Sequence, residues 1–320
     1  MKKFPLTVII ANYNSGIFLK KCINSINNCT KVPSEIIIVD DKSTDNSLKF
    51  AKILKKKNSN IKIICKKKNE GAAKARHVAL KKIKNKIISY IDADDFVENG
   101  ALFQAYKKLI KTKSDICLFK MYSYQDGNSA IHYANPVKKK LTGKEATEET
   151  LGKWNIHFSG VFRKDLFISA YNSLNIKRNL FNADELIIRL FFKNSQKIVT
   201  TNKKYFYRFH KLSTTNKTSL TYHRDNSRKL EELISYLWVI KFAKNEYNHL
   251  LYPCVRWGIS LSYKIWKQRK IISSTKTKIA LTRFLNAISK EVNLFTFYKN
   301  YPLHFFIFLY IKLNLLINNG

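Results

Sequence analysis

The nine residues 87–95, IISYIDADD, join a short apolar run to a cluster of acids. Residues 35–41, EIIIVDD, repeat the same arrangement. Apolar runs of this length, rich in β-branched residues and bounded by polar ones, predict buried strands. An open α/β sheet binds its ligands outside the carboxyl ends of the strands, where the side chains that follow them converge. We therefore expect the acids at 40–41 and 92–95 to face one pocket.

Strand-like and helix-like segments alternate around these two stretches. The predicted strands are residues 7–11, 35–40, 61–65, 87–92 and 115–121. The predicted helices are residues 16–28, 44–57, 72–83 and 101–111. Strands that alternate with helices favour a mostly parallel sheet with helices on both faces. The sequence therefore predicts an α/β fold.

The C-terminal part has a different pattern, because strand signals stop after Ser219. The predicted helices there are residues 225–248, 252–267 and 276–291. Residues 301–317 are apolar but are broken by Lys312 and Asn314, so they fall short of a membrane-spanning helix. We predict a catalytic domain over residues 1–218 and a helical C-terminal region over residues 219–320. These helices either adsorb to anionic headgroups or pack on their own domain with snorkelling lysines.

The chain is strongly basic, with a formal net charge of +37. This charge predicts attraction to polyanions, which include nucleic acid, anionic lipid headgroups and phosphorylated substrates. A biased base composition in the genome is an equal alternative, in which case most of the lysines are simply solvated. The sign of the charge does not choose among these partners.

The cysteines and the N-terminus indicate a reducing compartment. The five cysteines are widely spaced and include no CxxC pair, so we expect buried thiols rather than a zinc or redox site. The first residues, MKKFP, lead into a short apolar run without the cleavage site of a signal peptide. We expect a cytoplasmic location, on the inner face of the cytoplasmic membrane if the helices bind lipid.

The acids at 92–95 include the pattern Asp-x-Asp, formed by Asp92, Ala93 and Asp94. Several carboxylates in one crevice repel one another unless a cation or hydrogen-bond donors compensate them. Hard divalent ions such as Mg²⁺ or Mn²⁺ take oxygen ligands and bridge phosphates. A site for a metal ion and a diphosphate would explain the cluster, although aspartate is also common in caps and turns.

A basic partner lies between the two acidic stretches. Residues 69–76, NEGAAKAR, open a predicted helix, and the free amides at a helix N-terminus favour phosphate. Arg76 is the expected charged contact. The alternative is an ordinary turn at Gly71 with a solvated Arg76.

Four segments together resemble the family-2 glycosyltransferases of GT-A fold, a Rossmann-like α/β fold. They are TVIIANYN (7–14), EIIIVDDKSTDNS (35–47), NEGAAKARHVAL (69–80) and ISYIDADD (88–95). Their order and spacing match the family, and the resemblance extends over about residues 4–215. It does not cover the C-terminal helices.

The resemblance implies roles for individual residues. Ala11 and Tyr13 would line the nucleobase pocket, and Asp41 would accept a hydrogen bond from the base. Asp92 would meet the ribose or the first sugar, and Asp94 would bind the metal, with Asp95 as an adjacent candidate. The nucleotide-sugar site as a whole would comprise Ala11, Tyr13, Asp41, Asn69, Arg76, Asp92 and Ala93.

Two later segments complete the implied site. Residues 181–186, FNADEL, resemble the segment that carries the family's general base, so Asp184 would be that base, although Ala183 stands where the family usually has Glu. A pair of first-turn acids that complement a helix dipole is the alternative for this segment.

Residues 205–210, YFYRFH, resemble a segment that closes over the diphosphate, and His210 would be a metal or phosphate ligand. Trp154 and His157 match a region that shapes the acceptor pocket, or are packing residues.

Other nucleotide-binding classes lack their motifs here. The turn after the first strand, ANYNSG, is not the G-x-G-x-x-G of a dinucleotide enzyme, and no P-loop motif occurs. A nucleic-acid-binding protein would leave the acidic clusters unexplained, and a sugar-nucleotide nucleotidyltransferase would need a glycine-rich basic loop near the N-terminus.

We therefore predict an inverting glycosyltransferase that uses Mn²⁺ or Mg²⁺ and a UDP-hexose or UDP-N-acetylhexosamine. The predicted acceptor is a hydroxyl of a glycan or lipid-linked intermediate in lipooligosaccharide or capsule synthesis. An anionic membrane surface is an expected partner, and nucleic acid is not.

Overall fold

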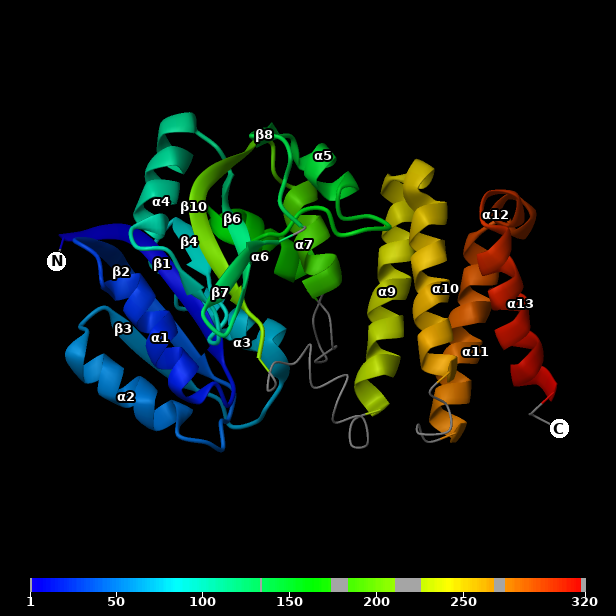
Figure 1. Ribbon diagram of the computed structural model, residues 1–320, viewed down its shortest axis with the longest axis horizontal. Coiled ribbons are helices and arrows are strands. Elements are labelled where there is room, and N and C mark those ends of the chain that lie inside the picture. Colours follow the sequence, from blue (N-terminus) through cyan, green and yellow to red (C-terminus); the bar gives the residue numbers. More distant parts are fainter. Residues whose placement is uncertain (1, 133, 174–183, 211–225, 268–273, 318–320) are drawn as a thin grey trace. The chain divides into compact units, whose positions relative to one another are not determined.

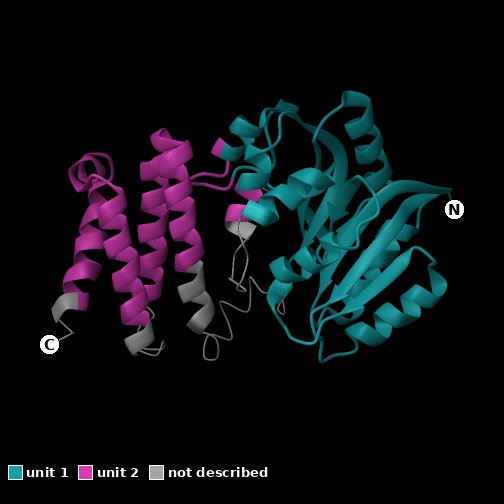
Figure 2. Ribbon diagram, turned by 180° about the vertical axis from the view of Figure 1, so that it is seen from behind, with its two compact units in different colours: residues 1–147, 155–179, 190–213 teal, residues 148–154, 180–189, 214–320 magenta. Residues whose placement is uncertain are grey.

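The computed structural model describes residues 2–132, 134–173, 184–210, 226–267 and 274–317, and the chain forms two compact units (Figure 2). The first unit comprises Met1–Thr147, Asn155–Asn179 and Leu190–Ser213, and the second comprises Glu148–Trp154, Leu180–Arg189 and Thr214–Gly320. The domain boundary predicted between residues 218 and 219 lies outside the described residues and stays a prediction.

One mixed sheet organises the first unit (Figure 1). Its strands are β1 (Lys2–Asn12), β2 (Lys31–Asp40), β3 (Ile61–Cys65), β4 (Ile87–Tyr90), β5 (Phe96–Val97), β6 (Ile116–Gln125), β7 (Asn128–Ile131), β8 (Lys140–Leu141), β9 (Gly160–Arg163) and β10 (Ile198–Arg208). They run in the order β3-β2-β1-β4-β9-β6-β10-β5, with β7 beside β6 and β8 beside β10. Strands β1 to β4 pair in parallel, as do β6 and β10, whereas β9 is antiparallel to both of its neighbours. The predicted α/β fold with a mostly parallel sheet is confirmed.

Helices cover both faces of this sheet. The helices in this part of the chain are α1 (Gly16–Asn27), α2 (Ser47–Lys57), α3 (Gly71–Leu80), α4 (Ala101–Thr112), α5 (Gly143–Glu148), α6 (Lys164–Ser173) and α7 (Asp184–Lys193), and α7 belongs to the second unit up to Arg189. The consecutive residues Val8, Ile9 and Ile10 of β1 are all fully buried, and successive strand side chains point to opposite faces. Val8 and Ile10 share a core with residues of α1, α2 and α4, whereas α3, which contacts β1 and β2, covers the other face.

The strand register brings the predicted site segments to one edge of the sheet. Asn12 at the end of β1 pairs with Asp40 at the end of β2, and Ile9 pairs with Tyr90 at the end of β4. Because these three strands are parallel, the loops that follow them leave from the same edge. The acids after β2 and β4 therefore emerge at neighbouring positions.

The second unit is helical, as the sequence predicts. Its helices are α9 (Asn226–Glu246), the short 3₁₀ helix η1 (Asn248–Leu250), α10 (Leu251–Lys267), α11 (Ser274–Glu291), α12 (Leu294–Asn300) and α13 (Pro302–Ile317). Their inward residues, among them Val239, Ile259 and Leu285, form one apolar core. No helix among the described residues has the length and apolar character to cross a bilayer.

The expectation of five buried thiols is wrong for Cys65, which is exposed at the end of the edge strand β3, and for Cys29, which is only partly buried. Cys22, Cys117 and Cys254 are buried. Burial raises the pKa of Cys117 to about 12, so its thiol stays protonated and unreactive at neutral pH.

The contact between β9 and β6 leaves no room for a side chain at Gly160. Gly160 pairs with Leu118, and a Cβ on it would lie 2.4 Å from the carbonyl oxygen of Cys117. Since the clash is with backbone, we expect Gly160→Ala to lower the free energy of unfolding by about 3 kcal/mol. Urea unfolding measures this loss.

Gly127→Ala is the matched control. No atom lies within 4 Å of a Cβ at Gly127, so the substitution costs only the strain of its φ of +93°, about 1 kcal/mol. Equal losses in the two variants would contradict the close backbone approach at Gly160.

Candidate active site

Asp41, in the loop after β2, is hydrogen-bonded to the start of α3. Both oxygens of this buried carboxylate accept backbone N–H bonds from Glu70, and Oδ2 also accepts one from Gly71, at 2.6 Å. The ammonium group of Lys66 lies 2.5 Å from Oδ1. A carboxylate at a helix N-terminus is favoured by the free amides and the helix dipole. Asp41 therefore sets where α3 begins, and its contact with a nucleobase stays a prediction.

Arg76 and Asp92, which the sequence assigns to one site, are brought together. Arg76 projects from α3, is buried, and donates from Nη2 to Asp92 Oδ1 at 2.8 Å. Its guanidinium carbon lies 4.8 Å from the centre of the Tyr90 ring. These contacts hold a cation at the carboxyl end of β4, and its contact with a phosphate stays a prediction.

The two predicted metal ligands also lie together. Asp94 follows β4 and His210 follows β10, yet His210 Nε2 lies 3.0 Å from Asp94 Oδ2. The Phe18 ring lies against the imidazole of His210, with ring centroids 4.5 Å apart. Arg208 Nε donates to the backbone carbonyl of Asp94 at 2.7 Å, which holds the two segments together.

Asp95 points away from this pair and into the protein. Its buried carboxylate accepts from Tyr205 Oη at 2.5 Å and from the Arg208 backbone N–H at 2.8 Å. Burial and the nearby carboxylates of Asp94 and Asp92 raise the pKa of Asp95 well above its usual range. Asp95 therefore anchors β10, and Asp94 is the carboxylate that faces His210.

A carboxylate and an imidazole fit a divalent cation that completes its shell elsewhere. Within the described part of the chain, no group of three or more His, Cys, Asp or Glu side chains is placed to hold a metal ion. Mg²⁺ is commonly held by one or two carboxylates, with waters and substrate phosphates as the other ligands. The residues present therefore fit an ion that binds together with a diphosphate.

The loops after β1 and β2 are joined by polar side chains that sequence reasoning overlooked. Asn14 Oδ1 accepts the Thr44 N–H at 2.8 Å, and Asn12 Nδ2 donates to Asp40 Oδ1 at 2.8 Å. Tyr13 lies between these two asparagines with 45% of its surface exposed. The ring is therefore available to a ligand, on a loop that is held on both sides.

The other predicted nucleotide-site residues differ in accessibility. Asn69 is exposed, Ala11 is partly buried, and Ala93 is buried. The side chain of Asp184, at the first position of α7, lies outside the described part of the chain, so its role as base stays a prediction.

Lys66 and Phe18 are site residues that the sequence analysis missed. Lys66 directly follows the last residue of β3, so its position at the carboxyl edge of the sheet was a usable signal. Phe18 lies in α1 and had no such signal, because an apolar residue on a helix is normally predicted to be part of the core.

The guanidinium group of Arg208 is held among three aromatic rings. Its guanidinium carbon lies 5.0 Å from the centre of the Phe18 ring, 4.9 Å from that of Phe96 and 5.3 Å from that of Tyr124.

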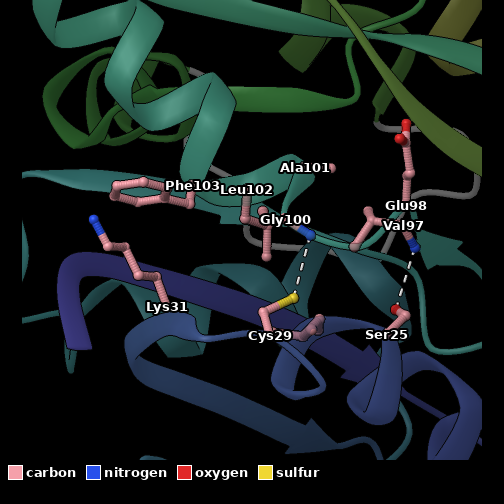
Figure 3. Close-up of a pocket in the computed structure, with 10 residues that line it drawn as sticks. Ser25, Cys29, Lys31, Val97, Glu98, Gly100, Ala101, Leu102 and Phe103 are labelled. Atoms are coloured by element: carbon pink, nitrogen blue, oxygen red, sulfur yellow. Dashed lines mark hydrogen bonds between the residues drawn. The ribbon is translucent and has the colours of Figure 1, made fainter. Parts of the chain in front are cut away.

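A small hollow elsewhere in the first unit is not part of this site (Figure 3). It lies between the end of α1 and the start of α4. Gly100 N–H donates to Cys29 Sγ, and Val97 N–H donates to Ser25 Oγ, both at 3.2 Å. Lys31 Nζ lies 4.2 Å from the centre of the Phe103 ring. These polar groups bond one another, so we assign them to the packing of the β5–α4 connection.

Comparison with known proteins decides the family. Residues 7–169 match the model of glycosyl transferase family 2, which is half of the chain. The chain belongs to this family. As a family-2 glycosyl transferase it is an enzyme of nucleotide-sugar transfer, and the nucleic-acid-binding and nucleotidyltransferase alternatives are not favoured.

Two relatives of this glycosyl transferase are similar over most of their lengths. Glycosyltransferase GlyG of Streptococcus pneumoniae is 26% identical over 63% of this chain and 70% of its own. Cholesterol galactosyltransferase of Borreliella burgdorferi is 26% identical over 84% of this chain and 82% of its own. A crystal structure of S. aureus TarS 1–349 in complex with UDP-GlcNAc has a TM-score of 0.67 at 20% identity and covers 98% of this chain and 90% of that one. This likeness confirms the GT-A fold.

Trp154 and His157, the two candidates for the acceptor region, both contact other residues of the protein. Arg189 lies over the Trp154 ring, with its guanidinium carbon 4.5 Å from the ring centre. His157 is buried and accepts from the Ser159 backbone N–H through Nδ1 at 3.0 Å. Burial, with a smaller contribution from His132, lowers the pKa of His157 to about 3, so the ring is neutral.

This buried histidine predicts acid sensitivity. Between about pH 6.5 and pH 3, His157 binds a proton in the unfolded chain but not in the folded one. Stability is therefore lost as pH falls through this range, by up to about 1.4 kcal/mol per pH unit. We expect His157→Asn, which keeps an acceptor near Nδ1, to remove this part of the pH dependence. Urea unfolding at pH 4.5 and pH 7 would show it, and an unchanged difference between the two pH values would exclude His157 as its source.

Proposed function

We propose that this glycosyl transferase moves a sugar from a UDP-hexose or UDP-N-acetylhexosamine to an acceptor hydroxyl in bacterial surface-glycan synthesis, with inversion at the anomeric carbon. The observation that carries the proposal is the pairing of Arg76, on α3, with Asp92 and of Asp94 with His210 at the carboxyl edge of the sheet. Support for the donor comes from S. aureus TarS, a poly(ribitol-phosphate) beta-N-acetylglucosaminyltransferase that is 27% identical over 65% of this chain and 35% of its own. Its 1–349 segment has been crystallised with UDP-GlcNAc and with UDP.

The donor would lie across the loops after β1, β2 and β4. The half-exposed Tyr13 ring offers a stacking surface to the nucleobase. Asp41, whose oxygens bond Lys66 and the first amides of α3, would also accept a hydrogen bond from the base. Arg76, at the carboxyl end of β4, favours the diphosphate electrostatically. Asp92, which accepts from Arg76, would then receive a ribose or sugar hydroxyl.

Asp94 and His210 would hold a Mg²⁺ or Mn²⁺ ion. Bound there, the ion would neutralise negative charge that develops on the leaving diphosphate. The support is the 3.0 Å separation of a carboxylate oxygen and an imidazole nitrogen that come from distant parts of the sequence.

The chemical step needs one base. Asp184 would take the proton of the acceptor hydroxyl while its oxygen attacks the anomeric carbon from the face opposite the diphosphate. The bond from the anomeric carbon to the diphosphate oxygen breaks, UDP leaves, and the configuration at that carbon inverts.

The acceptor would be a glycan or lipid-linked intermediate at the inner face of the cytoplasmic membrane, as in lipooligosaccharide or capsule synthesis. The support is the net charge of +37, which favours an anionic membrane surface.

Calorimetric titration of the chain with UDP and with GDP, each with Mn²⁺ and with EDTA, tests the donor and the metal together. We expect UDP to bind and the affinity to fall when the metal is removed. Binding of neither nucleotide, with strong salt-sensitive binding of RNA instead, would overturn the proposal in favour of a nucleic-acid-binding protein.

Asp94→Asn removes the proposed metal carboxylate but keeps an oxygen that can bond His210. We expect metal-dependent UDP affinity to fall by about tenfold or more, because even the partners of metal ligands contribute that much. Titration with UDP and Mn²⁺ measures the loss. Asp126→Asn is the control, since Asp126 is exposed in a turn at φ +49°, a conformation that Asn tolerates. Intact metal-dependent binding in Asp94→Asn would remove Asp94 as a ligand.

Asp184→Asn separates binding from chemistry. We expect UDP affinity to be unchanged and kcat to fall by about 100-fold to 10,000-fold, the usual contribution of a general base. The matched control is Asp165→Asn, an exposed acid in the first turn of α6. A fully active Asp184→Asn enzyme would assign the base to another residue.

A further inference from the structure

Helix α13 is apolar on the side that faces water as well as on the side that packs. Phe308, Ile311 and Leu315 are buried against the rest of the second unit. The opposite side exposes Leu303 (68%), Phe306 (58%), Tyr310 (50%) and Leu313 (55%). A surface helix of a globular protein normally places charged residues on its outer side. This side of α13 has none of them.

The exposed stripe continues onto α12. Phe295 is 65% exposed and Tyr298 is 40% exposed. The Tyr298 ring lies 6.0 Å from the Phe306 ring between centroids, so the two helices share one surface. We call the residues Phe295, Tyr298, Leu303, Phe306, Tyr310 and Leu313 the α12–α13 patch. Contiguous exposed apolar surface of this kind marks an interaction site.

Basic groups lie beside the α12–α13 patch. Lys299 Nζ lies 4.7 Å from the Phe295 ring centre, and the Arg256 guanidinium carbon lies 5.5 Å from that of Tyr301. Residues 247–320 contain eleven Lys and Arg and a single acid, Glu291. That acid is itself paired with Lys244, whose Nζ is 3.0 Å from it. A cation therefore lies against the patch, on a part of the chain whose sequence is strongly basic.

We infer that the α12–α13 patch docks on the interface of an anionic lipid bilayer, with its rings and leucines among the headgroups and the lysines and arginines on lipid phosphates. Apolar residues with flanking cations are what this interface selects. A second copy of the chain would bring the same positive charge to the patch, so a dimer through this surface is disfavoured. The sixteen residues of α13 span about 24 Å at about 1.5 Å per residue, less than the hydrocarbon core of about 30 Å, so the helix would lie on the bilayer.

The inference rests on the proposed function for its purpose, which is to bring the enzyme to a lipid-linked acceptor. Docking itself is measured without donor or acceptor, by co-sedimentation of the full chain with vesicles. One set of vesicles contains phosphatidylcholine and phosphatidylglycerol in equal amounts, and the other contains phosphatidylcholine alone. We expect the chain to sediment with the first set and only weakly with the second, and high salt to weaken the binding.

The test variant is Phe306→Ser with Tyr310→Ser, which removes two rings from the centre of the patch. Both side chains are at least half exposed, so we expect thermal unfolding to be unchanged. Vesicle affinity should fall by about tenfold or more. The matched control is Ile234→Ser, an apolar residue 47% exposed on α9 and outside the patch. The variants Leu303→Asn and Leu313→Asn test the two ends separately if the double variant folds poorly.

Each result decides between docking and its rivals. Wild-type affinity in the patch variants, or an equal loss in Ile234→Ser, would overturn the inference. A chain that ignores vesicles but sediments as a dimer, and as a monomer after Phe306→Ser with Tyr310→Ser, would assign the patch to a second copy. UDP binding is measured on the same samples, so its absence would refute the proposed function without bearing on the docking result.

Discussion

A buried carboxylate, Asp95, joins the acidic loop after β4 to strand β10. Its oxygens are held by the Tyr205 hydroxyl and the Arg208 backbone amide, and it lies beside Asp92 and Asp94. These two donors favour the carboxylate form, although burial and the neighbouring carboxylates still raise the pKa of Asp95. The same contacts bring Arg208 to the Asp94 carbonyl and His210 to the Asp94 side chain. The geometry of the proposed metal site therefore depends on this one anchored group.

The remainder of the site follows the same principle, in which each charged side chain is fixed by a partner on a different element. Asp41 is bonded by Lys66 and the first amides of α3, and Arg76 on that helix returns to Asp92. Such cross-links hold charged groups in place before a ligand arrives, which lowers the cost of ordering them on binding. The parallel strands make these links short because their carboxyl ends share one edge.

The second unit combines a conventional helical core with one helix, α13, whose outer side lacks the usual charged residues. Its buried side chains, such as Val239 and Leu285, account for the folding of the helices. They do not account for the exposed Phe295 and Phe306, which contribute little to that core. Exposed aromatic side chains beside a cationic group are better explained by binding to a partner than by the folding of the unit.

Sequence alone determined the α/β class, the strand at 61–65, a strand from 87 whose predicted end at 92 lies two residues beyond the observed one, and the segments that carry Asp41, Arg76, Asp92 and Asp94, because hydrophobic periodicity and local motifs record these features directly. It also indicated the C-terminal helices. It did not predict β10 or β9, whose residues pair with strands far away in the chain. The sequence named Asp94 as the metal ligand with Asp95 as an adjacent candidate, and only the tertiary structure shows that the two carboxylates have different partners.

That distinction arose because the surroundings of a carboxylate depend on residues more than a hundred positions away, namely Tyr205, Arg208 and His210. The exposure of the α12–α13 patch likewise depends on distant contacts. Periodicity shows that residues 302–317 are apolar, but which side of the helix stays exposed depends on how α10, α11 and α12 pack against it. Local pattern therefore decides element type and motif position, whereas burial and side-chain partners are decided by contacts that only the folded chain makes.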